Sequence, residues 1–165
     1  MEIETNLTDT ILAAWKTSNR VSIFMLENLP QEVWSEKVPG YQRKTVQMVG
    51  GHMHNTRCMW IKEATKKFDL HVPEYVDRYS VTTTELIEAL HISSAEIMQL
   101  IKKGIETGST VPGFYLDAVH LQYYLVAHEA HHRGQIVMVT RQLGYELPEK
   151  VTYGLWHWSK RAKEL

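Results

Sequence analysis

Hydrophobic residues recur three or four positions apart along four long stretches of the chain, and Gly- and Pro-containing segments separate these stretches. This spacing gathers apolar side chains on one face of an α-helix, whereas the alternation typical of a β-strand is absent. We predict helices over about residues 5–28, 45–68, 83–105 and 117–143. Helices of this length predict an all-α four-helix bundle. Because no long linker or internal repeat interrupts the pattern, we interpret residues 1–165 as one domain.

Residues that favour helix ends and turns mark the boundaries of these helices. Pro30 ends the first helix, and Gly144 with Pro148 stops the last one. Candidate N-terminal caps are Thr5 or Thr8, Thr45, and Thr83 or Thr84. The connection over residues 69–80 is long enough to cross an end of the bundle. We expect the aromatic tail over residues 153–158 to fold back as a lid or packing strap, or to contact another subunit.

The composition argues against attraction to nucleic acids or to anionic membranes. The formal net charge is −1, and the basic residues are scattered along the chain. No apolar run approaches the roughly 20 residues that cross a bilayer, and no signal peptide is evident. The single cysteine, Cys58, cannot form a disulfide within the chain, which fits a reducing compartment. We therefore expect a cytoplasmic protein that binds neither nucleic acid nor membrane.

The densest group of histidines lies in the last predicted helix, in the segment HEAHHRGQ over residues 128–135. His128 and His132 are one helical turn apart on the same face, and His131 is within reach of that face. Two imidazoles at this spacing can bind one metal ion. The face that carries them is mostly apolar and comprises Leu121, Tyr124, Leu125, His128, His132, Gln135 and Val139. We therefore expect these histidines in the interior and not on the rim.

A further histidine, His52, lies in the middle of the second predicted helix, directly after Gly50 and Gly51. His54 follows two residues later, about 200° around the helix, and should point away from whatever His52 meets. The two glycines either allow close packing or leave room for a ligand. By itself, His52 is better explained as a buried histidine bonded to a backbone carbonyl. If its face meets that of His128, three imidazoles can share one ion and leave a position open for water or substrate.

Five other side chains fall near the same level of the bundle and are candidates to orient ligands or substrate. They are Asn55, Thr56, Tyr124, His131 and Gln135. Cys58 lies about 240° around the helix from His52, where a small apolar packing role is expected. A site of three imidazoles suits zinc, nickel, iron or manganese, and the sequence does not choose among them.

Two segments resemble known motifs of one protein family. The HEAHHRGQ segment resembles the HxxHHRGQ signature of the DinB-like (YfiT-like) family. The segment from Val49 to Asn55, running on to Trp60, is similar to the first-histidine motif of that family. The order and spacing of the helices also match, so the resemblance covers nearly the whole chain.

The resemblance implies an up-down-down-up bundle that frequently forms homodimers. It also implies a three-histidine site for a divalent metal, with His52, His128 and His132 as ligands and His54 as the competitor for the first position. Characterised relatives include metal-dependent transferases that act with low-molecular-weight thiols such as bacillithiol or mycothiol. In such a reaction the metal lowers the pKa of the thiol, and the thiolate attacks a small electrophilic molecule.

Three alternatives remain open at this stage. The first is a metal-dependent hydrolase in which water activated by the metal is the nucleophile. The second is a non-catalytic, dimeric stress or binding bundle in which the histidines are structural. The third is a zinc protease, because residues 128–132 also spell HExxH. Gln135 stands where the longer protease pattern requires Gly, which disfavours this third alternative.

Overall fold

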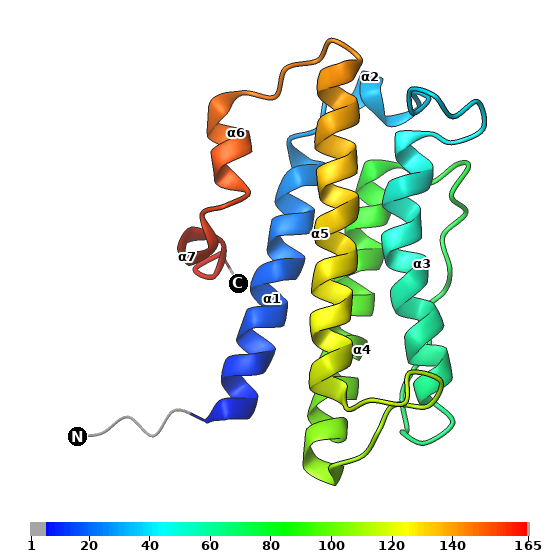
Figure 1. Cartoon of the computed structure of the whole chain (residues 1–165), viewed down its shortest axis with the longest axis vertical. Helices are drawn as coiled ribbons and strands as arrows, with labels where there is room; N and C mark the ends of the chain where they lie inside the picture. Colours follow the sequence, from blue (N-terminus) through cyan, green and yellow to red (C-terminus); the bar gives the residue numbers. More distant parts are fainter. Residues whose placement is uncertain (1–5, 165) are drawn as a thin grey trace.

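The structure, a computed structural model, describes residues 6–164, and within them all regular elements are helices (Figure 1). The helices are α1 (Leu7–Glu27), α2 (Gln31–Trp34), α3 (Val46–Ala64), α4 (Thr83–Thr107), α5 (Ala118–Gln142), α6 (Glu149–Gly154) and α7 (Trp158–Arg161). The predicted all-α fold is confirmed, and the four predicted helices correspond to α1, α3, α4 and α5. The short helices α2, α6 and α7 were not predicted. Among the described helices, none combines the length and apolar character that crossing a bilayer requires.

Two of the predicted helix caps are wrong by a residue or two. The side chain of Asn6 caps α1 by accepting a hydrogen bond from the Thr8 backbone N–H at 2.9 Å, and Thr5 lies outside the described residues. Thr82 caps α4 and forms a reciprocal capping box with Glu85. The predicted caps, Thr83 and Thr84, lie one and two residues further along the chain. Asn6 and Thr82 both place a side-chain oxygen against the otherwise unpaired N–H groups of the first turn.

The four long helices pack side by side around a common core. In Figure 1, α1 and α5 run in one direction along the bundle, while α3 and α4 run in the opposite direction. Thr45 caps α3 as predicted, and its hydroxyl accepts a hydrogen bond from the Met48 N–H at 3.2 Å. Asp117 caps α5 in the same way through the His120 N–H at 2.9 Å.

The core consists of two apolar clusters with a polar layer between them. One cluster lies at the α2 end of the bundle, and the other surrounds Trp15, Ile61 and Leu125. The layer between them contains buried polar side chains from all four long helices: Asn19, Ser22, His54, Arg57, Ser93 and Glu129. Each of these sits between apolar residues of its own helix, so the layer crosses the whole bundle at one level.

The connection between α3 and α4 runs back along the outside of α3 and does not cross an end of the bundle (Figure 1). The side-chain amide of Asn55 donates to the Val76 carbonyl and accepts from the Val76 N–H, both at 3.0 Å. Trp34 Nε1 donates to the Val81 carbonyl at 2.8 Å. These bonds to backbone groups hold the connection against α3, through Asn55, and against α2, through Trp34.

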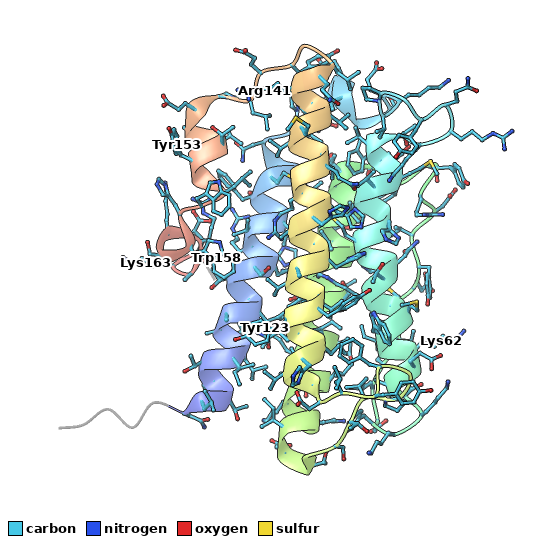
Figure 2. The ribbon with its side chains drawn as sticks, viewed as in Figure 1. Lys62, Tyr123, Arg141, Tyr153, Trp158 and Lys163 are labelled. Atoms are coloured by element: carbon cyan, nitrogen blue, oxygen red, sulfur yellow. The ribbon has the colours of Figure 1, made fainter. Side chains whose placement is uncertain are left out.

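The C-terminal tail is a packing strap along α1. The Arg161 guanidinium lies 3.9 Å from the centre of the Phe24 ring, and Arg20 forms an ion pair with Glu164 at 2.9 Å. Figure 2 shows Trp158 of the tail on the side of α1 that faces away from α3. The tail therefore does not act as a lid over the face of α3 that carries His52.

Replacing Gly50 by Ala is expected to destabilise the protein. An added Cβ would lie 2.5 Å from a ring carbon of Trp34, which is held by its bond to Val81. Overpacking of this kind costs about 1–3 kcal/mol, and the better helix propensity of Ala returns about 1 kcal/mol. We expect a net loss of up to about 2 kcal/mol in the free energy of unfolding, measured with urea.

Gly134→Ala is the matched control, because nothing lies within 4 Å of its added Cβ. This variant is expected to gain about 0.5–1 kcal/mol from helix propensity alone. Equal effects of the two substitutions would contradict the role of Gly50 in close packing.

Candidate metal centre

Three of the predicted histidines come together between α3 and α5. His128 Nε2 lies 3.1 Å from His52 Nε2 and 3.1 Å from His132 Nε2. The three ligand atoms all lie within 4.8 Å of one another. His132 is buried, while His52 and His128 are half-buried. The face of α3 that carries His52 therefore meets the face of α5 that carries His128, which is the condition for a shared site.

His128 Nε2 lies at the distance from each of its two neighbours that ligands of one small cation would have. In a tetrahedral zinc site, with Zn–N distances of about 2.0–2.1 Å, neighbouring nitrogens lie roughly 3.3 Å apart. A proton on His128 Nε2 can be donated to only one of its two neighbours, which leaves lone pairs facing each other. A divalent cation accepts all three lone pairs at once, so the donor set fits a metal ion.

The orientation of His132 is fixed by Gln135. The amide oxygen of Gln135 accepts a hydrogen bond from His132 Nδ1 at 2.8 Å. This bond places the proton on Nδ1 and leaves the lone pair of Nε2 directed at the other histidines. Tyr124 stacks on His128 with ring centres 5.9 Å apart and an angle of 23° between the rings.

The other candidate side chains lie further from the histidines. His131 is exposed, and its ring contacts the edge of His132 with centres 5.1 Å apart. Asn55 binds the backbone of Val76, as described above, and supports the site through the connection. Thr56 is buried within α3, and in the described chain it forms no hydrogen bond to the three histidines.

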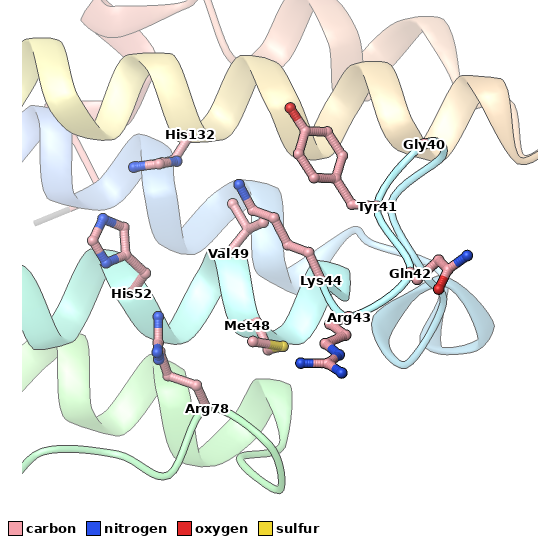
Figure 3. A pocket seen from close by; sticks show the side chains of 10 residues that line it. All are labelled: Gly40, Tyr41, Gln42, Arg43, Lys44, Met48, Val49, His52, Arg78 and His132. Carbon is pink, nitrogen blue, oxygen red and sulfur yellow. The ribbon is translucent and has the colours of Figure 1, made fainter.

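Two of the three histidines, His52 and His132, line a cavity that is open to solvent. This cavity has a volume of about 750 Å³ (Figure 3). The expectation of an interior site holds for His132, which is buried, and only in part for His52 and His128, which are half-buried. The face of α5 that meets the core is centred on Leu125, Glu129 and Ile136. His128 lies at the edge of that face, and Tyr124 is 39% exposed. A small molecule can therefore reach the site from solvent.

All three histidines are held in the neutral form that a metal ligand requires. Burial, together with the neighbouring His132 and His52, lowers the pKa of His128 to about 4. Burial also lowers the pKa of His132, and burial and the proximity of His132 lower that of His52. Near neutral pH, protons therefore compete weakly for these nitrogens.

A buried ion pair lies directly behind the histidines. Arg57 on α3 donates two hydrogen bonds to Glu129 on α5, from Nε at 2.7 Å and from Nη2 at 2.8 Å. The Ser22 hydroxyl also donates to Glu129, at 3.1 Å. Burial alone would raise the pKa of Glu129, but the charge and hydrogen bonds of Arg57 bring it below its ordinary value.

This pairing removes the chemical basis of the zinc-protease alternative. In that motif the Glu after the first His is the general base, and it must be free to meet water at the metal. Glu129 is 0% exposed, and Arg57 and Ser22 occupy its oxygens. Its role in this chain is to hold α5 against α3.

His54 and Cys58 lie apart from the cluster. His54 is buried and bonds the Glu74 carbonyl through Nε2 at 2.9 Å and the Ser93 hydroxyl through Nδ1 at 3.1 Å. It points away from His52, as its helical position predicted. Burial raises the pKa of the Cys58 thiol to about 11, so this cysteine is a poor nucleophile. Its Sγ lies 3.1 Å from His54 Nε2, so it also has a polar neighbour beside its apolar surroundings.

Three charged residues of this region were not among the predicted site residues, namely Lys44, Arg57 and Arg78. Arg57 had a signal, because it lies one turn after Met53 and one turn before Ile61 on the apolar face of its helix. A charged side chain on the apolar face of a helix is rarely buried without a partner of opposite charge. Its presence therefore predicts an acidic residue on the apolar face of another helix. Lys44 and Arg78 belong to connections between helices, and only the folded chain places them at the site.

Removing the carboxylate of Glu129 is expected to be strongly destabilising. Glu129→Ala leaves the Arg57 charge buried without its partner, which costs about 3–5 kcal/mol of unfolding free energy. Glu106→Ala removes an exposed partner of Lys102 at 4.0 Å and is expected to cost about 0.5 kcal/mol or less. Urea unfolding measures both variants.

A double variant tests the same pair if Glu129→Ala fails to fold. Arg57→Met combined with Glu129→Leu removes both charges and keeps similar volumes, so it should recover much of the lost stability. If the double variant is no more stable than Glu129→Ala, the unpaired Arg57 charge is not the cause of the loss. Arg133, which lies 4.0 Å from Glu129 and is retained in both variants, is then the buried charge that remains.

The stability of the metal-free protein is expected to fall as the pH decreases below about 6.5. The pKa of His128 is about 4 in the folded protein, so the unfolded chain binds more protons in this range. The contribution is fully present above the unfolded pKa and is lost as the pH falls toward the folded one. Urea unfolding with a chelator at about pH 7 and about pH 5.5 measures the change.

His128→Asn is expected to show a smaller decrease over that interval than the wild type. His91→Asn, on the exposed side of α4, should keep the wild-type decrease. Identical decreases in the wild type and in His128→Asn would show that His128 does not carry this effect.

Comparison with known proteins agrees with the motifs and the fold. The family model described as the DinB family matches residues 1–164, which is nearly the whole chain. A comparison with curated proteins found no match. The helical fold and the three converging histidines are consistent with the resemblance inferred from the HEAHHRGQ segment. The chain belongs to the DinB family.

Proposed function

We propose that this protein binds one divalent metal ion and catalyses a transfer reaction between a low-molecular-weight thiol and a small electrophilic molecule. The observation that carries the proposal is the convergence of His52, His128 and His132 on one point beside an open cavity. Family membership and the HEAHHRGQ segment support the same assignment. We propose zinc, nickel, iron or manganese as the ion, because a set of three imidazoles suits each of them.

The chain contributes to this chemistry by preparing the ligands and the space around them. When bound, the metal supplies Lewis acidity that lowers the pKa of a thiol. Gln135 fixes the tautomer of His132, and burial keeps all three imidazoles neutral. The Tyr124 ring stacks on one face of His128 and helps to orient it. The cavity of about 750 Å³ is large enough for a thiol and a small electrophile together.

Other features of the proposal follow from the family resemblance. We assign the long helices to the up-down-down-up order, which the directions of the helices in Figure 1 support. The resemblance also supports a single domain, a homodimer and a small-molecule substrate. The charge of −1 and the single cysteine support a cytoplasmic protein without nucleic-acid or membrane partners.

Metal content is the first test of this function. Elemental analysis of untagged protein is expected to give about one divalent metal ion per chain for the wild type. The variant His128→Ala with His132→Ala should lose the metal, because only one of the three ligands remains. His91→Ala, an exposed histidine of α4, is the matched control and should keep the metal.

A reaction assay then separates the possible activities. The metal-loaded protein should accelerate the consumption of a thiol by an electrophile, and the double variant should not. Hydrolysis of an activated ester without any thiol would support the metal-dependent hydrolase. If the wild type binds no metal even after loading with Zn²⁺ or Ni²⁺, the histidines are structural and the non-catalytic bundle is correct.

A further inference from the structure

One wall of the cavity beside the histidines is positively charged. The cavity is lined by Arg43, Lys44, Arg78, His52 and His132 together with uncharged residues. Among the described residues that line it, there is no Asp or Glu. Figure 3 shows that Lys44 and Arg78 extend their charged ends toward the histidines from opposite connections. A molecule that enters this cavity therefore meets cations before it reaches the imidazoles.

Lys44 and Arg78 have no carboxylate partner in the described chain. Both side chains are half-buried, yet neither appears in an ion pair with any described residue. Asp77, the neighbour of Arg78, instead accepts hydrogen bonds from the Tyr79 N–H and the Ser80 hydroxyl. Half-buried cations are usually paired, so these two are available to bind an anion from solution.

The position of Arg78 is built into the fold. An added Cβ at Gly51 would lie 3.0 Å from Arg78 Cγ and 3.4 Å from its Cα, so the glycine allows the connection to approach α3 closely. The clamp from Asn55 to Val76 fixes the backbone two residues before Arg78. Arg78 therefore reaches the site from a held backbone.

Lys44 is held in a similar way on the other connection. Its carbonyl accepts a hydrogen bond from the Val38 N–H at 2.8 Å, which closes the loop before α3. Its Nζ lies 5.6 Å from the centre of the Tyr41 ring, which also lines the cavity. Figure 3 shows the charged end of Lys44 extending toward the histidines, as that of Arg78 does.

We propose that the molecule that binds at the three histidines carries an oxyanion, a carboxylate or a phosphate, which is held by Lys44 and Arg78. This inference rests on the proposed function, because it names the class of thiol or acceptor that the same site takes. Charge balance supports it: three neutral imidazoles and a divalent ion beside two cations leave the cavity strongly positive. An acidic ligand neutralises this excess and gains charge-assisted hydrogen bonds.

Calorimetric titration of the Zn²⁺-loaded protein with four probes tests the inference. Mercaptosuccinate supplies a thiol with carboxylates, thioglycerol a neutral thiol, succinate the carboxylates alone, and inorganic phosphate the other oxyanion. We expect mercaptosuccinate to bind at least about tenfold more tightly than thioglycerol, and its binding to weaken as the ionic strength rises. The tighter of succinate and phosphate identifies the oxyanion.

Variants of the two cations show whether they are responsible. Lys44→Gln and Arg78→Gln should each weaken mercaptosuccinate binding by about tenfold and leave thioglycerol binding unchanged. Lys44→Arg and Arg78→Lys keep the charge and should retain most of the affinity. Lys37→Gln removes an exposed cation from the same loop as Lys44 and should have no effect. Helical circular dichroism confirms that each variant folds.

The outcomes separate this inference from the proposed function. If both thiols bind equally and the variants change neither, the oxyanion site is wrong while thiol binding stands. A second outcome is that replacing the histidines, in His128→Ala with His132→Ala, weakens the binding of neither thiol, while succinate or phosphate binding is lost in the Gln variants. In that case the oxyanion site stands and the proposed thiol reaction is wrong. If no probe binds, both are overturned.

Discussion

The buried ion pair between Arg57 and Glu129 sets how α3 and α5 face each other. Neither side chain is exposed, so each charge depends on the other and on nearby hydrogen bonds. The guanidinium also donates to groups on two further helices, namely Asn19 Oδ1 on α1 and the Leu90 carbonyl and Ser93 hydroxyl on α4. A rotation of either helix would leave a charge buried and unpaired. Because Glu129 follows His128 directly, the same constraint turns that histidine toward His52.

The site thus has two layers with different electrostatic character. The inner layer is the set of imidazoles, neutral because burial lowers their pKa values. The outer layer is the cationic wall of Lys44 and Arg78, which comes from connections and not from helices. The neutral imidazole nitrogens of the inner layer can bind a metal cation, and the cationic side chains of the outer layer can bind an anion. A ligand with a soft reactive group at one end and an oxyanion at the other matches both layers.

Helical periodicity was sufficient to predict the long helices and the pairing of His128 with His132, because both depend on local spacing. The contribution of His52 could not be derived in this way, since it requires knowing which face of α3 meets α5. The interior position expected for the histidines holds for His132 but only in part for His52 and His128, because the core face of α5 includes Glu129 and leaves Tyr124 39% exposed. Lys44 and Arg78 carry no local signal at all, because tertiary contacts alone bring their connections to the site.

The glycines before His52 show why part of α3 departs from good helix-forming sequence. Each Gly in a helix interior costs about 1 kcal/mol relative to Ala. At Gly50 this cost allows the Trp34 ring to pack against α3, and Trp34 in turn binds the Val81 carbonyl. At Gly51 it allows the chain around Arg78 to lie on the helix. The local loss of helix propensity therefore allows the connection that carries Arg78 to lie against α3 beside His52.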